Sequence, residues 1–159
     1  MTRILLFLAV AMTILQCEGD SKGMKAYYYK GGKTVECRLS PADRTKTLAM
    51  LNDVFAGTDD MLRVRVSEQL VGRIRTTETA LEFVFDKPSE FTSRTHGKYA
   101  VKRLLLPLTG DYAGTGNDYV ATVFVANDAG FISGPLRNPQ ARPVLLKLQN
   151  LLSKLPQNR

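Results

Sequence analysis

Segments with the two-residue alternation of β-strands follow one another along most of this 159-residue chain. Helical periodicity interrupts them once, and a second helical segment closes the chain. Strands that are consecutive in sequence pair as antiparallel hairpins, whereas parallel neighbours need a crossover helix between them. The order therefore predicts an α+β domain, in which an antiparallel sheet of about six to eight strands is packed by two helices.

The first part of the predicted domain is a β-hairpin followed by a helix. Two β-prone runs flank the glycine pair 31–32, which supplies the positive φ angles that a tight hairpin turn requires. Ser40 and Pro41 are the residue types preferred at a helix N-cap and in its first turn. We expect an amphipathic helix from about residue 41 to residue 56, after which Gly57 ends it.

We interpret the middle of the chain as a β-meander. Apolar and polar residues alternate in 62–66, less cleanly in 70–75, and again in 81–86. This pattern predicts an antiparallel sheet with one packed face and one solvated face. Residues 87–98 show neither period and contain Pro, Ser, Thr and Gly, so we expect a long exposed loop there.

A buried strand, a closing hairpin and a terminal helix complete the predicted domain. We expect the strand at 99–108, a loop at 110–118 and the hairpin at 119–133. The helix is predicted to begin near Asn138 or Arg142, because each precedes a proline that a first turn tolerates. Its apolar stripe consists of Val144, Leu145, Leu148, Leu151, Leu152 and Leu155.

The N-terminus has the layout of a secretory signal peptide. Arg3 precedes a twelve-residue apolar run, 4–15, and a polar exit. A membrane-spanning helix needs about 20 apolar residues, so this run is too short to be one. We expect residues 1–19 to be the signal peptide, 20–24 a short tether and 25–156 a single globular α+β domain.

The residues Ile14-Leu15-Gln16-Cys17 resemble the lipobox of bacterial lipoproteins, although Gln16 replaces the small residue of that pattern. In that family the cysteine becomes acylated, so the resemblance implies a membrane anchor at Cys17. It covers the signal and not the fold. Ordinary cleavage after Gly19, which would remove Cys17, is the alternative.

The composition limits the chemistry that the domain can perform. Two cysteines and one histidine exclude a disulfide scaffold, a four-cysteine zinc site and any site that needs two imidazoles. We expect no metal and no cofactor, and we expect Cys37 to be a small buried hydrophobe. The whole chain has a formal net charge of +7, and the exported domain remains basic once Arg3 is removed. It would attract an acidic protein or an anionic envelope component, and nucleic acid is not expected.

Four arginines are the strongest candidates for binding. Arg63 and Arg65 share one face of the first meander run, and Arg73 and Arg75 share one face of the second. If these runs pair as strands, their guanidiniums form a patch suited to carboxylates or phosphates. The alternative is a solvated face neutralised by nearby acidic residues. Tyr28, which points away from its neighbouring tyrosines, offers a second contact surface.

These features favour an exported, lipid-anchored cell-envelope protein with a non-catalytic role in partner binding, inhibition or assembly. No catalytic residue is predicted. The first alternative is a small extracytoplasmic hydrolase that uses the predicted loops 87–98 and 110–118, the former of which contains His96. The second alternative is a protein that binds anionic lipid or polysaccharide through the arginine face.

Overall fold

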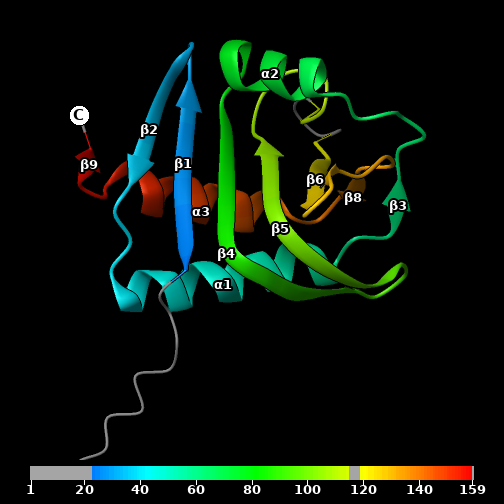
Figure 1. Cartoon of the computed structure of the whole chain (residues 1–159), viewed down its shortest axis with the longest axis horizontal. Coiled ribbons are helices and arrows are strands. Elements are labelled where there is room, and N and C mark those ends of the chain that lie inside the picture. Colours follow the sequence, from blue (N-terminus) through cyan, green and yellow to red (C-terminus); the bar gives the residue numbers. More distant parts are fainter. Residues whose placement is uncertain (1–22, 115–118, 159) are drawn as a thin grey trace, which may run out of the picture.

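The computed structural model describes residues 23–114 and 119–158, so the predicted signal peptide and Cys17 lie outside the described residues. Within that part of the chain there are three helices and one sheet (Figure 1). The helices are α1 (Pro41–Ala56), α2 (Glu68–Thr77) and α3 (Arg142–Ser153). The strands are β1 (Met24–Lys30), β2 (Lys33–Cys37), β3 (Asp60–Met61), β4 (Ala80–Ser93), β5 (Gly97–Pro107), β6 (Ala121–Asn127), β7 (Gly130–Phe131), β8 (Leu136–Asn138) and β9 (Gln157–Asn158).

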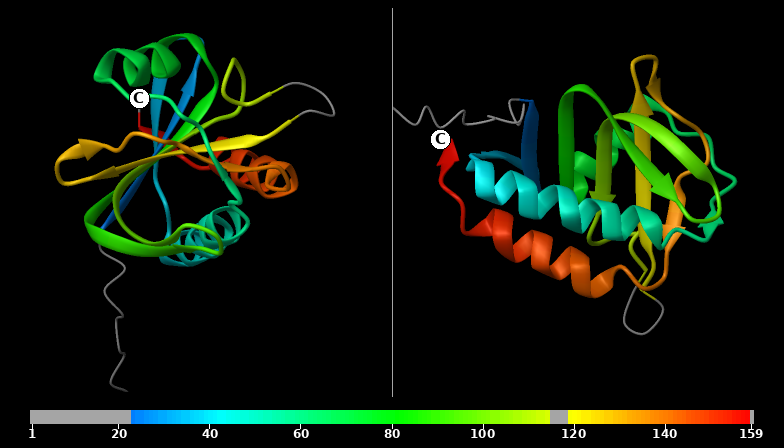
Figure 2. Two further views of the ribbon diagram at one scale, coloured as in Figure 1. Left: turned by 90° about the vertical axis from the view of Figure 1, so that its right-hand side faces the viewer. Right: turned by 90° about the horizontal axis from the view of Figure 1, so that it is seen from below.

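The sheet is open and antiparallel. Its strands lie in the order β3-β8-β6-β5-β4-β1-β2-β9, and β7 pairs with β6. Helices α1 and α3 lie side by side on one face, while α2 covers part of the other face (Figure 2). The predicted α+β class is therefore confirmed, with one helix more than expected.

The local signals at the start of the domain form the predicted elements. Gly31 and Gly32 have φ angles of 56° and 75°, and they turn β1 back along β2. Ser40 caps α1, because its Oγ accepts a hydrogen bond of 3.1 Å from the Asp43 amide. The helix ends at Ala56, as its sequence indicates.

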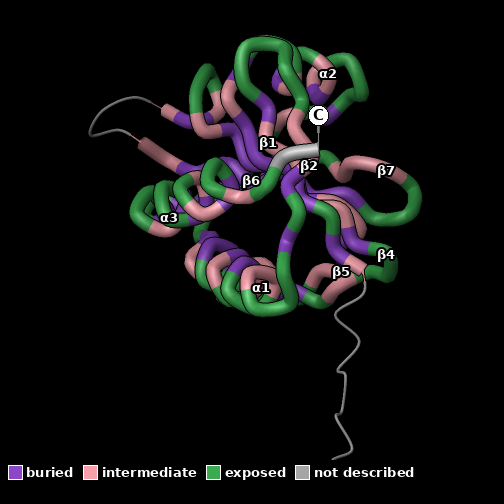
Figure 3. Tube along the Cα trace, turned by 90° about the vertical axis from the view of Figure 1, so that its left-hand side faces the viewer, coloured by how far each residue is buried: buried purple, intermediate pink, exposed green. Residues whose placement is uncertain are grey.

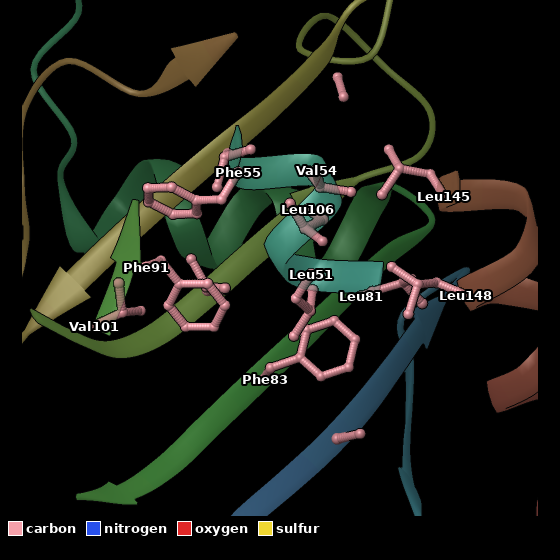
Figure 4. Packing of buried hydrophobic residues seen from close by; sticks show 14 of the residues in the cluster. Leu51, Val54, Phe55, Leu81, Phe83, Phe91, Val101, Leu106, Leu145 and Leu148 are labelled. Atoms are coloured by element: carbon pink, nitrogen blue, oxygen red, sulfur yellow. The ribbon is translucent and has the colours of Figure 1, made fainter. Parts of the chain in front are cut away.

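The main core lies between the sheet and the pair α1 and α3. Leu51, Val54 and Phe55 of α1, with Leu145 and Leu148 of α3, pack against buried side chains of β4 and β5 (Figure 4). Along the tube in Figure 3 the central strands are buried, whereas the outer sides of the helices are exposed. The apolar run of β5 is buried on both faces, because Leu104 and Leu106 join this core while Leu105 packs under α2.

Residues 70–75 form a helix, so the prediction of a strand there is wrong. Ser67 caps α2 by accepting a hydrogen bond of 3.1 Å from the Leu70 amide. Val71 and Ile74, three residues apart, are both fully buried, which is the spacing of a helix face. Over this short length, the alternation of Arg73 and Arg75 with uncharged residues matches the pattern of a strand. Residues 62–66 belong to no strand, and the Val64 amide donates a hydrogen bond of 2.9 Å to the Leu62 carbonyl, which makes a tight turn at Arg63.

Residues 87–98 are not a long loop, which corrects a second prediction. They belong to β4, a three-residue turn and the start of β5, and the turn ends at Gly97 with a φ of 80°. Pro88 sits at an irregularity of register between Val84 and Ser89, where a missing amide is tolerated. The sequence does not show the apolar and polar alternation of a strand here, because Ser93 occupies a buried position and is polar.

Three short strands were also absent from the predicted elements. β3, β8 and β9 contain only two or three residues each, which is too short for a periodic pattern to reveal. They pair at or near the two edges of the sheet.

Neighbouring leucines of α3 provide a matched test of the core. Leu148 is fully buried, whereas Leu146 is 51% exposed on the same helix. We expect Leu148→Ala to lower the free energy of unfolding by about 2–5 kcal/mol and Leu146→Ala by less than about 1 kcal/mol. Urea denaturation of both variants measures the difference. Equal losses would contradict the placement of α3 on the sheet.

Candidate functional site

An open cleft of about 660 Å³ lies at the β3 end of the sheet, on the right of Figure 1. One wall is the chain from residue 59 to residue 65, which includes β3. His96 from the β4–β5 turn also lines the cleft, as do Ser133 and Gly134 from the link between β7 and β8. We call this site the arginine cleft, because Arg63 and Arg65 line it.

Backbone hydrogen bonds fix the arginine wall of the cleft. The Leu62 amide donates to the Pro135 carbonyl over 2.9 Å, and the Gly134 amide donates to the Val64 carbonyl over 3.1 Å. Gly134 has a φ of 79°, and a Cβ there would lie 2.6 Å from the Met61 Sδ. Only glycine fits this close approach without displacing Met61.

The alternation in this wall points both arginines outward. Val64 packs against the core beneath α2, and Val66 is buried. Arg63 and Arg65 are exposed, as the alternation predicts. Neither side chain forms an ion pair or a hydrogen bond with any residue that the structure describes. Their guanidiniums are therefore available to a ligand.

The nearest acidic group at β3 already has a partner. An oxygen of Asp60 lies 3.5 Å from Arg137 Nη1, and the other accepts a hydrogen bond of 2.7 Å from the Met61 amide. Asp59 also lines the cleft and is exposed. The cleft thus contains charges of both signs, and Arg63, Arg65 and Asp59 have no side-chain partner among the described residues.

His96 is held in the cleft through its backbone. Its amide donates to Ser93 Oγ over 3.1 Å, and that oxygen lies 2.7 Å from Thr58 Oγ1, just after α1. The Nε2 atom of His96 is buried and has no hydrogen-bond partner among the described residues.

This arrangement is suited to holding an anion. Guanidiniums present paired donors that match carboxylate and phosphate oxygens. A nucleophile and base would instead have to be joined by a hydrogen bond. Within the described part of the chain, the His96 side chain forms none. Residues 87–98, which the hydrolase alternative invokes, form a hairpin rather than a loop.

The predicted patch of four arginines on one sheet face does not form. Arg73 and Arg75 belong to α2, whereas Arg63 and Arg65 precede it in the cleft wall. Arg73 is exposed on α2, and Arg75 reaches down to the sheet. The four guanidiniums therefore have different surroundings, because residues 70–75 are helical.

Arg75 belongs to a buried network centred on Glu82 of β4. Both oxygens of Glu82 accept hydrogen bonds from Arg75, over 2.7 and 3.0 Å. Arg103 of β5 donates twice to one oxygen, over 2.9 and 3.0 Å, and the Tyr29 hydroxyl of β1 donates to the other over 2.7 Å. The Glu82 side chain is only 2% exposed. Four elements thus meet at one carboxylate.

The network keeps Glu82 ionised. Burial by itself would raise the pKa of this carboxyl, but the hydrogen bonds from Arg75 and Tyr29 hold the pKa below its usual value. Burial and the hydrogen bond to Glu82 raise the pKa of the Tyr29 hydroxyl. A buried charge is tolerated only when it is paired and hydrogen-bonded, and Glu82 is both.

The alternation in 81–86 predicts that Glu82 lies on the solvated face of the meander, and Arg103 is not among the candidate residues. A signal for the network was present, because Glu82 interrupts the apolar run from Ala80 to Phe85. A carboxylate in such a run needs a buried partner. Which cations reach it depends on tertiary contacts that the sequence pattern does not contain.

Tyr28 faces the helices rather than solvent. It is half-buried against the main core, and its hydroxyl accepts a hydrogen bond of 3.3 Å from Gln149 of α3. Tyr27 and Tyr29 pack on the other face of the sheet, so the predicted alternation of the three tyrosines is confirmed. Tyr28 is therefore mainly a packing residue of β1.

Comparison with known protein families, curated proteins and solved structures finds no match for this chain. Among residues 23–114 and 119–158, no helix is long and apolar enough to cross a membrane. The same residues contain no group of three or more His, Cys, Asp and Glu placed to hold a metal ion. Cys37 is a buried free thiol, and burial raises its pKa to about 11.

Proposed function

We propose that this chain is an exported, lipid-anchored cell-envelope protein whose domain binds an acidic segment of a partner protein in the arginine cleft. The signal-like N-terminus and the lipobox resemblance at Cys17 support export and anchoring. One observation supports the binding role above the others. Arg63 and Arg65 are exposed in the cleft without a partner among the described residues.

The spacing of the two arginines suggests the form of the ligand. Only one residue separates Arg63 from Arg65, so two acidic side chains in one short segment can each meet one guanidinium. Exposed Met61, with Leu62 and Val64, gives the cleft apolar area beside its charges. We therefore favour a Glu-x-Glu type of segment with a neighbouring apolar residue.

Removing the two cations tests this role. We expect Arg63→Ser with Arg65→Ser to weaken binding of a fluorescent Glu-x-Glu peptide about tenfold, since each partly exposed ion pair contributes roughly 0.5–1 kcal/mol. Fluorescence anisotropy at low and high salt measures the affinity, and binding by the unmodified protein should weaken as salt rises.

Arg73→Ser with Lys147→Ser is the matched control, because both residues are exposed and neither lines the cleft. This control should bind as tightly as the unmodified protein, and a Gln-x-Gln peptide should bind neither form well. Salt-independent binding, or equal losses in both double variants, would contradict the proposal.

Lipid anchoring at Cys17 has its own test. Acylated protein should enter the detergent phase on phase partitioning, because acyl chains add about 0.8 kcal/mol of membrane affinity per buried CH₂. Cys17→Ser should move the protein to the aqueous phase or leave it unprocessed. Mass spectrometry of the native N-terminus identifies the modified residue. A wholly aqueous protein that begins at Asp20 would overturn the anchor.

A further inference from the structure

Basic side chains gather where the chain enters the folded domain. Gly23 is the first described residue, and its carbonyl accepts a hydrogen bond of 2.6 Å from the Asp86 amide. Lys25 lies two residues further along, opposite Val84 in the sheet register. In Figure 1 this end of β1 is at the lower edge of the sheet, close to α1.

Three more cations lie at the same end. Lys87 follows Asp86 directly, and the Lys102 ammonium donates a hydrogen bond to the Asp86 carbonyl. Arg38 follows Cys37, which pairs with Ala26 near the start of β1. We call these four residues the tether-end surface: Lys25, Arg38, Lys87 and Lys102.

The tether-end surface has an excess of positive charge. Lys25, Arg38 and Lys87 are exposed, and none of the four cations forms an ion pair with a described residue. Asp86 is the acidic residue among them, with its side chain against Gly23. Asp43 at the start of α1 is engaged by Ser40. Glu36, two residues before Arg38 on β2, is a second carboxylate without a partner among the described residues, so four cations face two uncommitted carboxylates.

The length of the tether brings this surface close to a bilayer. Five residues lie between Cys17 and Gly23, and the six steps from one Cα atom to the next span at most about 20 Å when fully extended. A bilayer with anionic lipids attracts nearby lysines, and the attraction falls off within a Debye length of about 8 Å at physiological ionic strength. Any looser path of the tether places the cations nearer to the headgroups.

We propose that the tether-end surface contacts anionic phospholipid headgroups and orients the domain on its membrane. This inference rests on the proposed acylation of Cys17. The arginine cleft lies at the β3 end of the sheet, away from the start of β1 (Figure 1). A domain docked by its tether end therefore keeps the cleft open to a partner.

Lysine footprinting on the native acylated protein tests the contact. The protein is reconstituted on vesicles of phosphatidylcholine, alone or with about 30% phosphatidylglycerol, and floated to isolate the bound form. An acetylating reagent then modifies accessible amines, and mass spectrometry measures the rate at each lysine. We expect the rates at Lys25, Lys87 and Lys102 to fall at least about threefold on the anionic vesicles and to recover at 0.5 M salt, because screening weakens the contact.

Lys30, at the other end of β1, and Lys147 of α3 are internal controls, because both are exposed and neither belongs to the tether-end surface. Their rates should be the same on both vesicles. Charge reversal by Lys25→Glu with Lys87→Glu should restore the Lys102 rate, whereas Lys30→Glu with Lys147→Glu should not.

The outcomes separate the two proposals. Protein that does not float with neutral vesicles overturns the acyl anchor. Protein that floats but shows equal rates at all lysines on both vesicles overturns the membrane contact while the anchor stands. Protection that persists at high salt, or that is equal at Lys147, also overturns it, because neither result comes from headgroup charge at this surface.

Discussion

The buried carboxylate of Glu82 is the interaction on which the second face of the sheet depends. Helix α2 has only ten residues, and its buried side chains are Val71 and Ile74. Arg75 adds a two-point contact from this helix to Glu82, while Tyr29 and Arg103 hold the same carboxylate from β1 and β5. Loss of that charge would leave two arginines facing each other across a largely desolvated space.

The position of α2 in turn fixes the arginine cleft. Ser67, which caps α2, directly follows the segment that carries Arg63 and Arg65. The other end of the segment is held by β3 and by backbone hydrogen bonds to Pro135 and Gly134. The two exposed arginines are thus presented by a chain that is held at both ends. Such preorganisation reduces the entropy cost of binding a ligand.

Much of the architecture was predictable where a local rule determines the structure. The Gly31-Gly32 turn, the Ser40 cap and the leucine stripe of α3 each depend on a few neighbouring residues, and each formed as expected. The α+β class followed from the succession of strands. The predicted strand at 70–75 and the predicted loop at 87–98 were wrong. The first segment is too short to show its helical period, and in the second the buried residue Ser93 is polar, which masks the alternation of a strand.

The candidate site was predictable only in part. The alternation correctly predicted that Arg63 and Arg65 are exposed. Grouping them with Arg73 and Arg75 assumed a strand at 70–75, where the structure has a helix. The Glu82 network joins residues up to 53 positions apart, so its partners are set by tertiary structure alone. The same limit applies to His96, which reaches the cleft through the β4–β5 turn. Export, anchoring and partner binding stay predictions.

Hydrogen exchange of the α2 amides tests the role of Glu82 most directly. In Glu82→Gln at pH 7, we predict that α2 exchanges about 30–150-fold faster, because removal of the buried charge costs about 2–3 kcal/mol when its arginines can turn toward solvent. Glu90→Gln, which breaks the exposed pair with Lys98, should leave α2 unchanged. The pKa of Glu82 is lowered in the folded protein, so its contribution is complete above the unfolded value of about 4.3 and is lost as the pH falls below it. The difference between the unmodified protein and Glu82→Gln should therefore shrink in acid. Equal α2 exchange in both proteins at pH 7 would contradict the account.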